Sequence, residues 1–309
     1  MSVRSLSPEL AEQAATKLNE TPKRLEDGIQ HLKEWISKQP HLRANTDDQW
    51  LAAFLRGCKH SMERAKAKLD LYYSLRTISP DLFSFTTKDQ RFQAMIQSQS
   101  VLILPATIKP EDPRVVLARP ALYDPQMYGI TEWFSYSHLI QQVMYMEDDV
   151  FMVNGALAIV DLKGVTLSHI IQMTPVQIKK LIVAGQDASP LRVRSMHFVN
   201  STPIVEAVFN FAIKHLNAKH KERIHVHSED ASVLYDKYVD KRILPTEYGG
   251  SWGSAQDIVD YWNKKFIEYG SWFDEDERCG TDESKRPGKP KTAGEMFGVD
   301  GSFRKLDVD

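Results

Sequence analysis

Histidines and basic residues in the second half of the chain are the candidates for binding a metal ion or an anion. His225 and His227 alternate in the run IHVH, so on a strand both imidazoles would face one side, a spacing that metal ions can use. The other histidines are scattered and the two cysteines stand far apart, so the sequence suggests no third ligand. We therefore interpret the histidines as structural or solvated and predict no metal site.

Four basic residues form a second group. Arg192 and Arg194 alternate on an extended segment and so face the same side, while Lys219 and Arg223 are one helical turn apart. Arginine can bind phosphate through two parallel hydrogen bonds and lysine as a point charge, which suits a phosphoinositide headgroup. From the residues alone, a solvated face with ordinary ion pairs is the alternative.

Motifs for catalysis are missing from the sequence. There is no GxSxG nucleophile turn, no GxxxxGK[ST] phosphate loop, no HExxH and no GxGxxG. We accordingly predict no catalytic residue, no enzymatic activity and no cofactor.

Composition and charge limit the classes of partner that the chain can be expected to bind. A net charge of −2 gives no global electrostatic reason to bind nucleic acid. Cys58 and Cys279 suggest neither a disulfide framework nor a zinc cluster, which fits a reducing cytosol. The polar N-terminus lacks the apolar region of a signal peptide, and no apolar run approaches the roughly 18 residues of a membrane span. We expect a cytoplasmic monomer that meets membranes only peripherally and reversibly.

The first and last parts of the chain differ in pattern from the middle. Residues 1–90 read as a bundle of short helices, because apolar residues recur at three-to-four spacing, as in Leu25, Ile29, Leu32 and Ile36. Residues 269–309 are polar, charged and rich in Gly and Pro, and are predicted to be a flexible tail.

Residues 91–268 alternate between short apolar runs and helical periodicity. Runs bounded by Pro and Gly predict buried strands, and helical patterns lie between them. The strands are expected at 101–105, 114–120, 155–164, 196–200 and 223–228, and the helices at 132–147, 175–185 and 203–219. This alternation predicts an α/β domain with a mostly parallel sheet flanked by helices.

The helix expected from Pro203 has one strongly apolar side. Its apolar residues at helical spacing are Ile204, Val205, Val208, Phe209, Phe211 and Ala212. Periodicity alone favours a surface helix packed permanently on the core.

Four stretches, in order, resemble the CRAL-TRIO family. They are LAAFLRGCKHSMERAKAKLDLYYSLR (51–76), NGALAIVDLKGVTLSH (154–169), PLRVRSMHFVNSTPIVEAVFNFAIKHLNAKHKERIHVH (190–227) and LPTEYGG (244–250). The resemblance implies a CRAL-TRIO fold, in which an N-terminal helical module sits on an α/β domain that encloses a hydrophobic pocket. It also implies that the helix from Pro203 is a lid over the ligand.

The resemblance further implies which residues act. Positions matching the family's pocket lining, together with one face of the preceding helix, are Tyr136, Leu139, Ile140, Val143, Ala156, Val160, Leu167, Met173, Leu181, Ala184 and Leu191. The basic residues Arg192, Arg194, Lys219 and Arg223 match positions that bind a phosphoinositide headgroup. A further basic position of the family falls on Cys58, and the neighbouring Lys59 is the expected replacement.

The implied function is an intracellular carrier of one hydrophobic small molecule, such as a tocopherol, a retinoid, a carotenoid or a similar lipid. It would exchange this ligand at phosphoinositide-containing membranes by moving the lid. A regulator that is recruited to phosphoinositide membranes without transferring ligand is the alternative. The sequence does not choose the cargo, because pocket shape depends on backbone positions that motifs do not fix.

Overall fold

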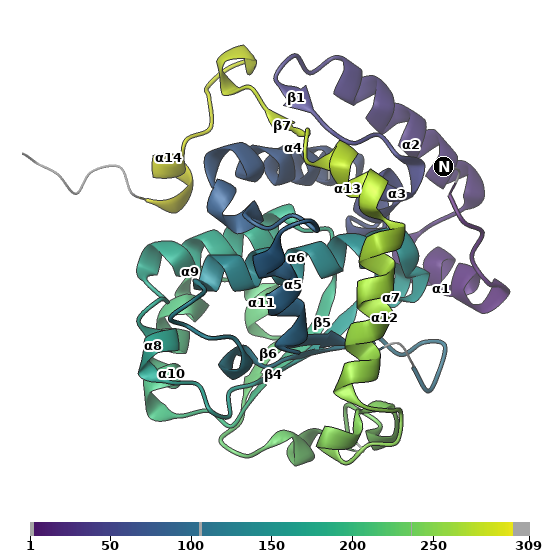
Figure 1. The fold of residues 1–309 in the computed structure, drawn as a ribbon. Coiled ribbons are helices and arrows are strands. Elements are labelled where there is room, and N and C mark those ends of the chain that lie inside the picture. Colours follow the sequence, from purple (N-terminus) through teal and green to yellow (C-terminus); the bar gives the residue numbers. More distant parts are fainter. Residues whose placement is uncertain (1–2, 105–106, 236, 299–309) are drawn as a thin grey trace, which may run out of the picture.

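A computed structural model describes residues 3–104, 107–235 and 237–298 of the chain (Figure 1). Its N-terminal part is a module of helices. They are α1 (Pro8–Leu18), α2 (Pro22–Ser37), α3 (Asp48–Gly57), α4 (Met62–Ile78), a 3-10 turn (Pro80–Phe83) and α5 (Gln90–Gln97). Side-chain oxygens of Ser7, Thr21 and Asp47 accept hydrogen bonds from the first backbone amides of α1, α2 and α3, which explains where these helices begin.

The middle of the chain forms a five-stranded sheet in the order β2-β3-β4-β5-β6. The strands are β2 (Val101–Ile103), β3 (Arg114–Ala118), β4 (Ala156–Asp161), β5 (Val193–Val199) and β6 (Ile224–Val226). Strand β2 is antiparallel to β3, and the other pairs are parallel. The predicted mostly parallel sheet is confirmed.

Helices connect and cover these strands. They are α6 (Ile130–Glu147), α7 (Asp149–Asn154), α8 (Leu167–Ile170), α9 (Pro175–Ile182), a π-helical turn (Val183–Ala188), α10 (Pro203–Ala212), α11 (Ala218–Lys221) and α12 (Ala255–Glu268). Short 3-10 turns lie at Pro120–Leu122, Ile213–His215, Ala231–Leu234, Lys241–Ile243 and Thr246–Tyr248.

The segment expected as one helix over 203–219 is broken. After α10 and its 3-10 turn, Leu216 is extended, and the side chain of Asn217 accepts a hydrogen bond from His220 N to begin α11. Asparagine favours such a cap, so the chain restarts a helix instead of continuing one. All six predicted lid residues nevertheless fall within α10.

The prediction of a flexible tail from residue 269 is wrong for residues 270–297. This segment forms α13 (Gly270–Asp276), β7 (Gly280–Thr281), a 3-10 turn (Glu283–Lys285) and α14 (Ala293–Phe297). Strand β7 pairs with β1 (Leu42–Arg43) of the N-terminal module, and Phe297 is buried. Residues 299–309 of the predicted tail lie outside the described residues.

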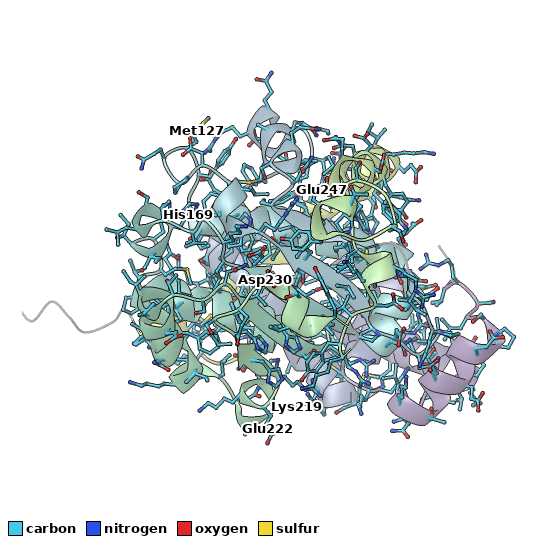
Figure 2. All side chains as sticks on the ribbon, turned by 90° about the horizontal axis from the view of Figure 1, so that it is seen from below. Met127, His169, Lys219, Glu222, Asp230 and Glu247 are labelled. Carbon is cyan, nitrogen blue, oxygen red and sulfur yellow. The ribbon has the colours of Figure 1, made fainter. Side chains whose placement is uncertain are left out.

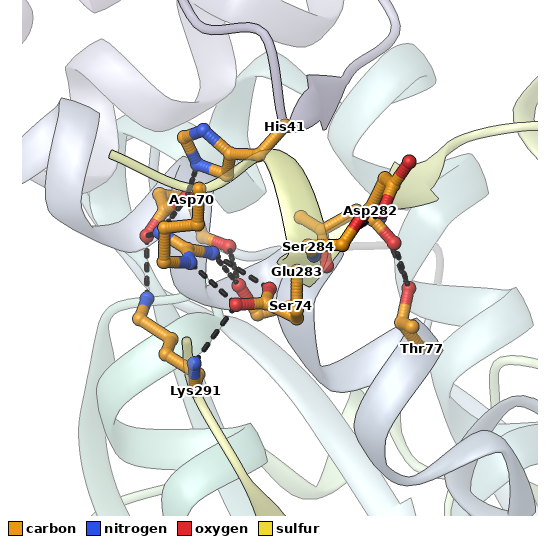
Figure 3. A network of polar contacts seen from close by, with 10 residues as sticks. His41, Asp70, Ser74, Thr77, Asp282, Glu283, Ser284 and Lys291 are labelled. Carbon is orange, nitrogen blue, oxygen red and sulfur yellow. Dashed lines mark hydrogen bonds and ion pairs between the residues drawn. The ribbon is translucent and has the colours of Figure 1, made fainter. Parts of the chain in front are cut away.

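Ion pairs hold this C-terminal arm, residues 277–298, against α4 (Figure 3). Asp70 accepts hydrogen bonds from Arg286 at 2.9 Å, from Lys291 and from His41 at 2.8 Å. Burial acts to raise the pKa of Asp70, but these bonds outweigh it and hold that pKa below its usual value. A polar segment can therefore fold without an apolar run, because its charges find partners on the neighbouring module.

Candidate functional site

Apart from Arg114 at the start of β3, one face of the sheet carries apolar side chains from β3 to β6. In parallel strands, residues in register point to the same side, so Val160 of β4 shares a face with its partners Ala118 of β3 and Phe198 of β5. Extending the register across the sheet gives the floor, defined as Val116, Ala118, Ala158, Val160, Met196, Phe198, Ile224 and Val226.

The two faces differ in how well they are covered. On the opposite face, Leu117, Ile159 and Val199 are fully buried at 0% exposure. On the floor, Ala118 alone is buried, and Val226 is exposed. One side of the sheet therefore carries a solid core. The other side is buried at Val101 and Ile103 of β2 but keeps apolar surface open over β3 to β6.

Helix α10 lies over this floor. The ring of Phe209 meets the ring of Phe198 edge to face, with centroids 5.1 Å apart. Although its sequence PIVEAVFNFA is largely apolar, α10 contributes no buried residue, and none of its side chains belongs to either hydrophobic core. A helix packed permanently on a protein buries its apolar stripe. Helix α10 thus covers the floor without being locked into the core.

The residues predicted to line the ligand pocket differ in how deeply they are buried. Those of α6, namely Tyr136, Leu139, Ile140 and Val143, are buried in the main core, as are Ala156 and Ala184. Val160, Met173, Leu181 and Leu191 are half-buried, and Val160 is part of the floor. Leu167 is 62% exposed, so the structure does not place it in a wall. The role of these residues in ligand binding stays a prediction.

The sequence prediction did not assign most floor residues. Val116, Met196, Phe198, Ile224 and Val226 all lie in runs that were predicted as strands. Their alternation within each run could have assigned them to one face, since successive strand residues point to opposite sides. Which of the two faces stays open depends on how helices pack, and this cannot be read from alternation.

A second apolar surface surrounds α8. Leu167 and Ile171 are 62% and 67% exposed, and Met127 is 62% exposed. The loop bearing Met127 is fixed beside α8, because Gln172 Nε2 donates to Pro125 O at 3.0 Å and to Tyr128 O at 3.1 Å. Single exposed apolar residues are ordinary, but several on adjoining segments indicate an interaction surface. We call Leu122, Met127, Leu167 and Ile171 the apolar tip.

The predicted basic residues converge. Burial and the nearby charges of Arg194 and Arg223 together lower the pKa of Arg192 to about 10. Burial also lowers the pKa of Lys219, and Arg223 and Lys59 add to this effect. Two cations that the sequence prediction missed, Arg64 and Lys17, couple to the same group. The cationic basin is Lys17, Lys59, Arg64, Arg192, Arg194, Lys219 and Arg223.

The backbone explains how residues from two modules meet in the basin. Gly57 lies directly against Pro190 O, where an added Cβ would come within 2.2 Å of that oxygen. Lys59 follows with a positive φ of 51°, which turns the chain between α3 and α4. The absence of a side chain at position 57 therefore lets this turn lie beside Arg192, while Cys58 is buried and uncharged.

Few acidic residues act on the basin: Glu111 acts on Lys17, and Glu222 on Arg223. In the part of the chain that the structure describes, none of Lys59, Arg64, Arg192, Arg194, Lys219 or Arg223 forms an ion pair. Arg192 instead donates to the backbone carbonyl of Val153, and Arg223 to that of Val193. The view in Figure 2 places Lys219 far from Met127 and His169, so the basin and the apolar tip are separate surfaces.

Comparison with known proteins follows the same division of the chain. Residues 21–89 match a family model described as a Pinta-like UBA domain, and residues 99–250 match the CRAL/TRIO domain. The human alpha-tocopherol transfer protein-like protein is 33% identical over 264 residues, covering 84% of this chain and 74% of that protein. The chain belongs to the CRAL/TRIO family. Human clavesin-2 is 28% identical over 247 residues, covering 79% of this chain and 75% of the relative.

The matched CRAL/TRIO region includes two stretches that the structure joins. Tyr248 of the LPTEYGG turn donates its hydroxyl to Asp161 Oδ2 at 2.5 Å, at the carboxyl end of β4. Asn200 Nδ2 donates to the other oxygen at 2.7 Å. The CRAL/TRIO match ends at Gly250, so the C-terminal arm lies beyond it.

The histidines do not make a metal centre. Among the described residues, no three His, Cys, Asp or Glu side chains are arranged to hold a metal ion. Residues 3–104, 107–235 and 237–298 also contain no helix with the length and apolarity needed to cross a bilayer. The structure does bring His197 beside His225 and His227, a proximity that its distance along the chain did not suggest.

Proposed function

We propose that this protein is a non-enzymatic carrier that takes one hydrophobic lipid between the floor and α10, and exchanges it at phosphoinositide-containing membranes. The observation that carries the proposal is the apolar floor left open beneath a helix with no buried residue. The proposed carrier works in the cytoplasm as a monomer, associates with membranes reversibly and needs no cofactor. Family membership supports a lipid ligand, and the relatives' names include a tocopherol transfer protein-like protein.

The floor favours a ligand without charge. Its eight side chains carry no hydrogen-bonding group, so a buried headgroup there would lose its contacts with water and gain none. Apolar area gains roughly 25 cal/mol per Å² when it leaves water. The hydrocarbon part of a tocopherol, retinoid, carotenoid or similar molecule meets this condition.

A lid of this kind can open at low cost. Closed, the apolar side of α10 covers the ligand; open at a bilayer, the same side enters the interfacial zone. Because both surroundings are apolar, modest differences in contact free energy can shift the equilibrium between the two positions. Ile204, which is exposed, and the apolar tip would meet the bilayer first.

The membrane contact can be tested at the apolar tip. Replacing both Leu167 and Ile171 with serine is expected to slow lipid transfer between vesicles about 30-fold, because each buried side chain contributes on the order of 1 kcal/mol at an interface. Lipid binding in solution should not change. Ile267→Ser is the matched control, since this exposed residue lies on α12 away from the tip. Equal slowing by the control would contradict the assignment.

The basin makes a separate, electrostatic prediction. Arg194→Gln with Lys219→Gln is expected to weaken binding to phosphoinositide vesicles about 30-fold, since each cation near an anionic surface contributes about 1 kcal/mol. Vesicle flotation at rising salt measures it, and wild-type binding should weaken as salt screens the charges. The control is Lys23→Gln with Lys38→Gln, which removes equal charge from exposed residues in α2 and at its C-cap and should leave binding unchanged. Vesicle binding that does not change with salt concentration would indicate that the protein binds only by inserting apolar side chains.

The carrier and the recruitment regulator differ in one measurement. A carrier accelerates lipid exchange between donor and acceptor vesicles, whereas a regulator only binds them. Native mass spectrometry with organic extraction of protein from its source cells should find one unmodified lipid per chain. Protein that is free of lipid and does not speed exchange would leave the regulator as the better description.

A further inference from the structure

Three imidazoles are stacked on the buried face of the sheet, opposite the floor. The ring of His197 on β5 lies 4.8 Å from that of His225 and 5.5 Å from that of His227, both nearly parallel to it. His197 Nδ1 and His227 Nε2 are 3.2 Å apart and share a hydrogen bond. His197 is fully buried, and its Nε2 has no hydrogen-bond partner.

The stack sits where the lid returns to the sheet. The lid segment leaves β5 after Val199 and comes back through Arg223 into β6, a three-residue edge strand. Backbone bonds hold this strand, from Met196 N to Arg223 O at 2.7 Å and from His227 N to Phe198 O at 2.8 Å. Strand β6 therefore anchors both the end of the lid segment and one cation of the basin.

We propose that His197, His225 and His227 form a proton-binding site. On acidification it loosens β6 and thereby frees the C-terminal end of the lid segment, where that segment enters β6. The coupling to ligand release rests on the proposed carrier function, whereas the loosening of β6 does not. Two neutral imidazoles can share a proton in a hydrogen bond, but once both are protonated each nitrogen is a donor and the bond is lost. Parallel cationic rings at these separations also repel.

The surroundings add positive charge to the stack. Tyr238 packs on His197 with ring centroids 4.4 Å apart, and the Lys237 ammonium lies over the Tyr238 ring. On β4 the register partner of His197 is the apolar Ile159. Glu229, fully exposed, is the acidic group whose charge couples to His227. The described residues thus place no buried carboxylate against His197 to compensate a bound proton.

The direction of the pH effect follows from His197. Burial, together with the nearby His225, His227 and Lys237, lowers the pKa of His197 to about 4. Because the folded state then binds the proton less readily than the unfolded chain, the stability it contributes is present above about pH 6.5 and falls towards pH 4. Acid therefore opens this region.

Amide hydrogen exchange tests the loosening without any lipid. In the full-length protein, protection of the amides of residues 224–229, corrected for intrinsic rates, is expected to fall about tenfold between pH 7.5 and 5.5, while that of β3 and β4 changes little. His197→Gln with His227→Gln should remove this pH dependence, because it removes the buried imidazole and its hydrogen-bond partner. The control is His31→Gln, at an exposed residue of α2, and it should behave as wild type. Unchanged protection in the wild type, or the same fall in the double variant, would overturn the proposal.

A second experiment tests whether the loosening of β6 promotes ligand release through the lid. Release of a fluorescent tocopherol analogue from preloaded protein into neutral vesicles is expected to accelerate on acidification in wild type and His31→Gln, but not in the double variant. Equal acceleration in all three would overturn the coupling. A protein that takes up no analogue would count against the carrier function. The amide hydrogen exchange measurement would still show whether acid loosens β6.

Discussion

Ala158→Trp is expected to yield a folded protein that carries no lipid. Ala158 lies in the middle of the floor, with Val116 and Met196 as its register partners. An indole projecting from this position would occupy the space beneath α10 that the ligand needs. Bound lipid, measured by extraction and mass spectrometry, should fall at least about tenfold, which corresponds to a steric penalty of about 1.4 kcal/mol or more.

The neighbouring residue provides the matched control. Ile159 points to the opposite face, where it is fully buried. Enlarging a side chain within a close-packed core typically costs about 1–3 kcal/mol, so Ile159→Trp should lower the melting temperature. Ala158→Trp should leave it unchanged or raise it, since the indole covers open apolar surface. If both variants unfold equally, the floor is packed and the carrier proposal fails.

Local patterns were enough to predict the parts of the fold that depend on one segment at a time. Short apolar runs bounded by Pro and Gly located the five strands, and three-to-four spacing located α10. The alternation of Arg192 with Arg194 indicated a basic site. Such patterns report the face that a residue occupies within its own element. They do not report which distant element lies opposite.

The features that the sequence did not predict all depend on contacts between distant segments of the chain. Asp70 gives no sign in the sequence that Arg286 and Lys291 will fold a polar arm onto it. Arg64 and Lys17 join the basin from the N-terminal module, while Arg192 and Lys219 come from the other. His197 meets His225 through strand pairing. Each contact depends on how modules and strands dock, and composition within a window carries no record of it.

Arg56→Ala is expected to destabilise the protein by about 3–5 kcal/mol, the range observed when one partner of a buried ion pair is removed. Arg56 is 1% exposed, and its guanidinium bridges Glu20 at 2.9 Å and Asp149 at 3.0 Å. Glu20 precedes α2, whereas Asp149 begins α7 of the other module. Lys285→Ala, which breaks an exposed pair, should change stability by less than about 1 kcal/mol.

The same network predicts how stability depends on pH. Burial acts to raise the pKa of Glu20, but hydrogen bonds from His60 and Arg56 outweigh it and lower that pKa to about 2. The folded state therefore favours the ionised carboxylate, and this contribution is present above about pH 4.5 and is lost as pH falls towards 2. Urea unfolding at pH 7 and pH 3 should show a smaller acid loss in Arg56→Ala than in wild type. An equal loss would mean that Glu20 is not held by Arg56, and that another contact joins the helical module to the domain bearing the floor.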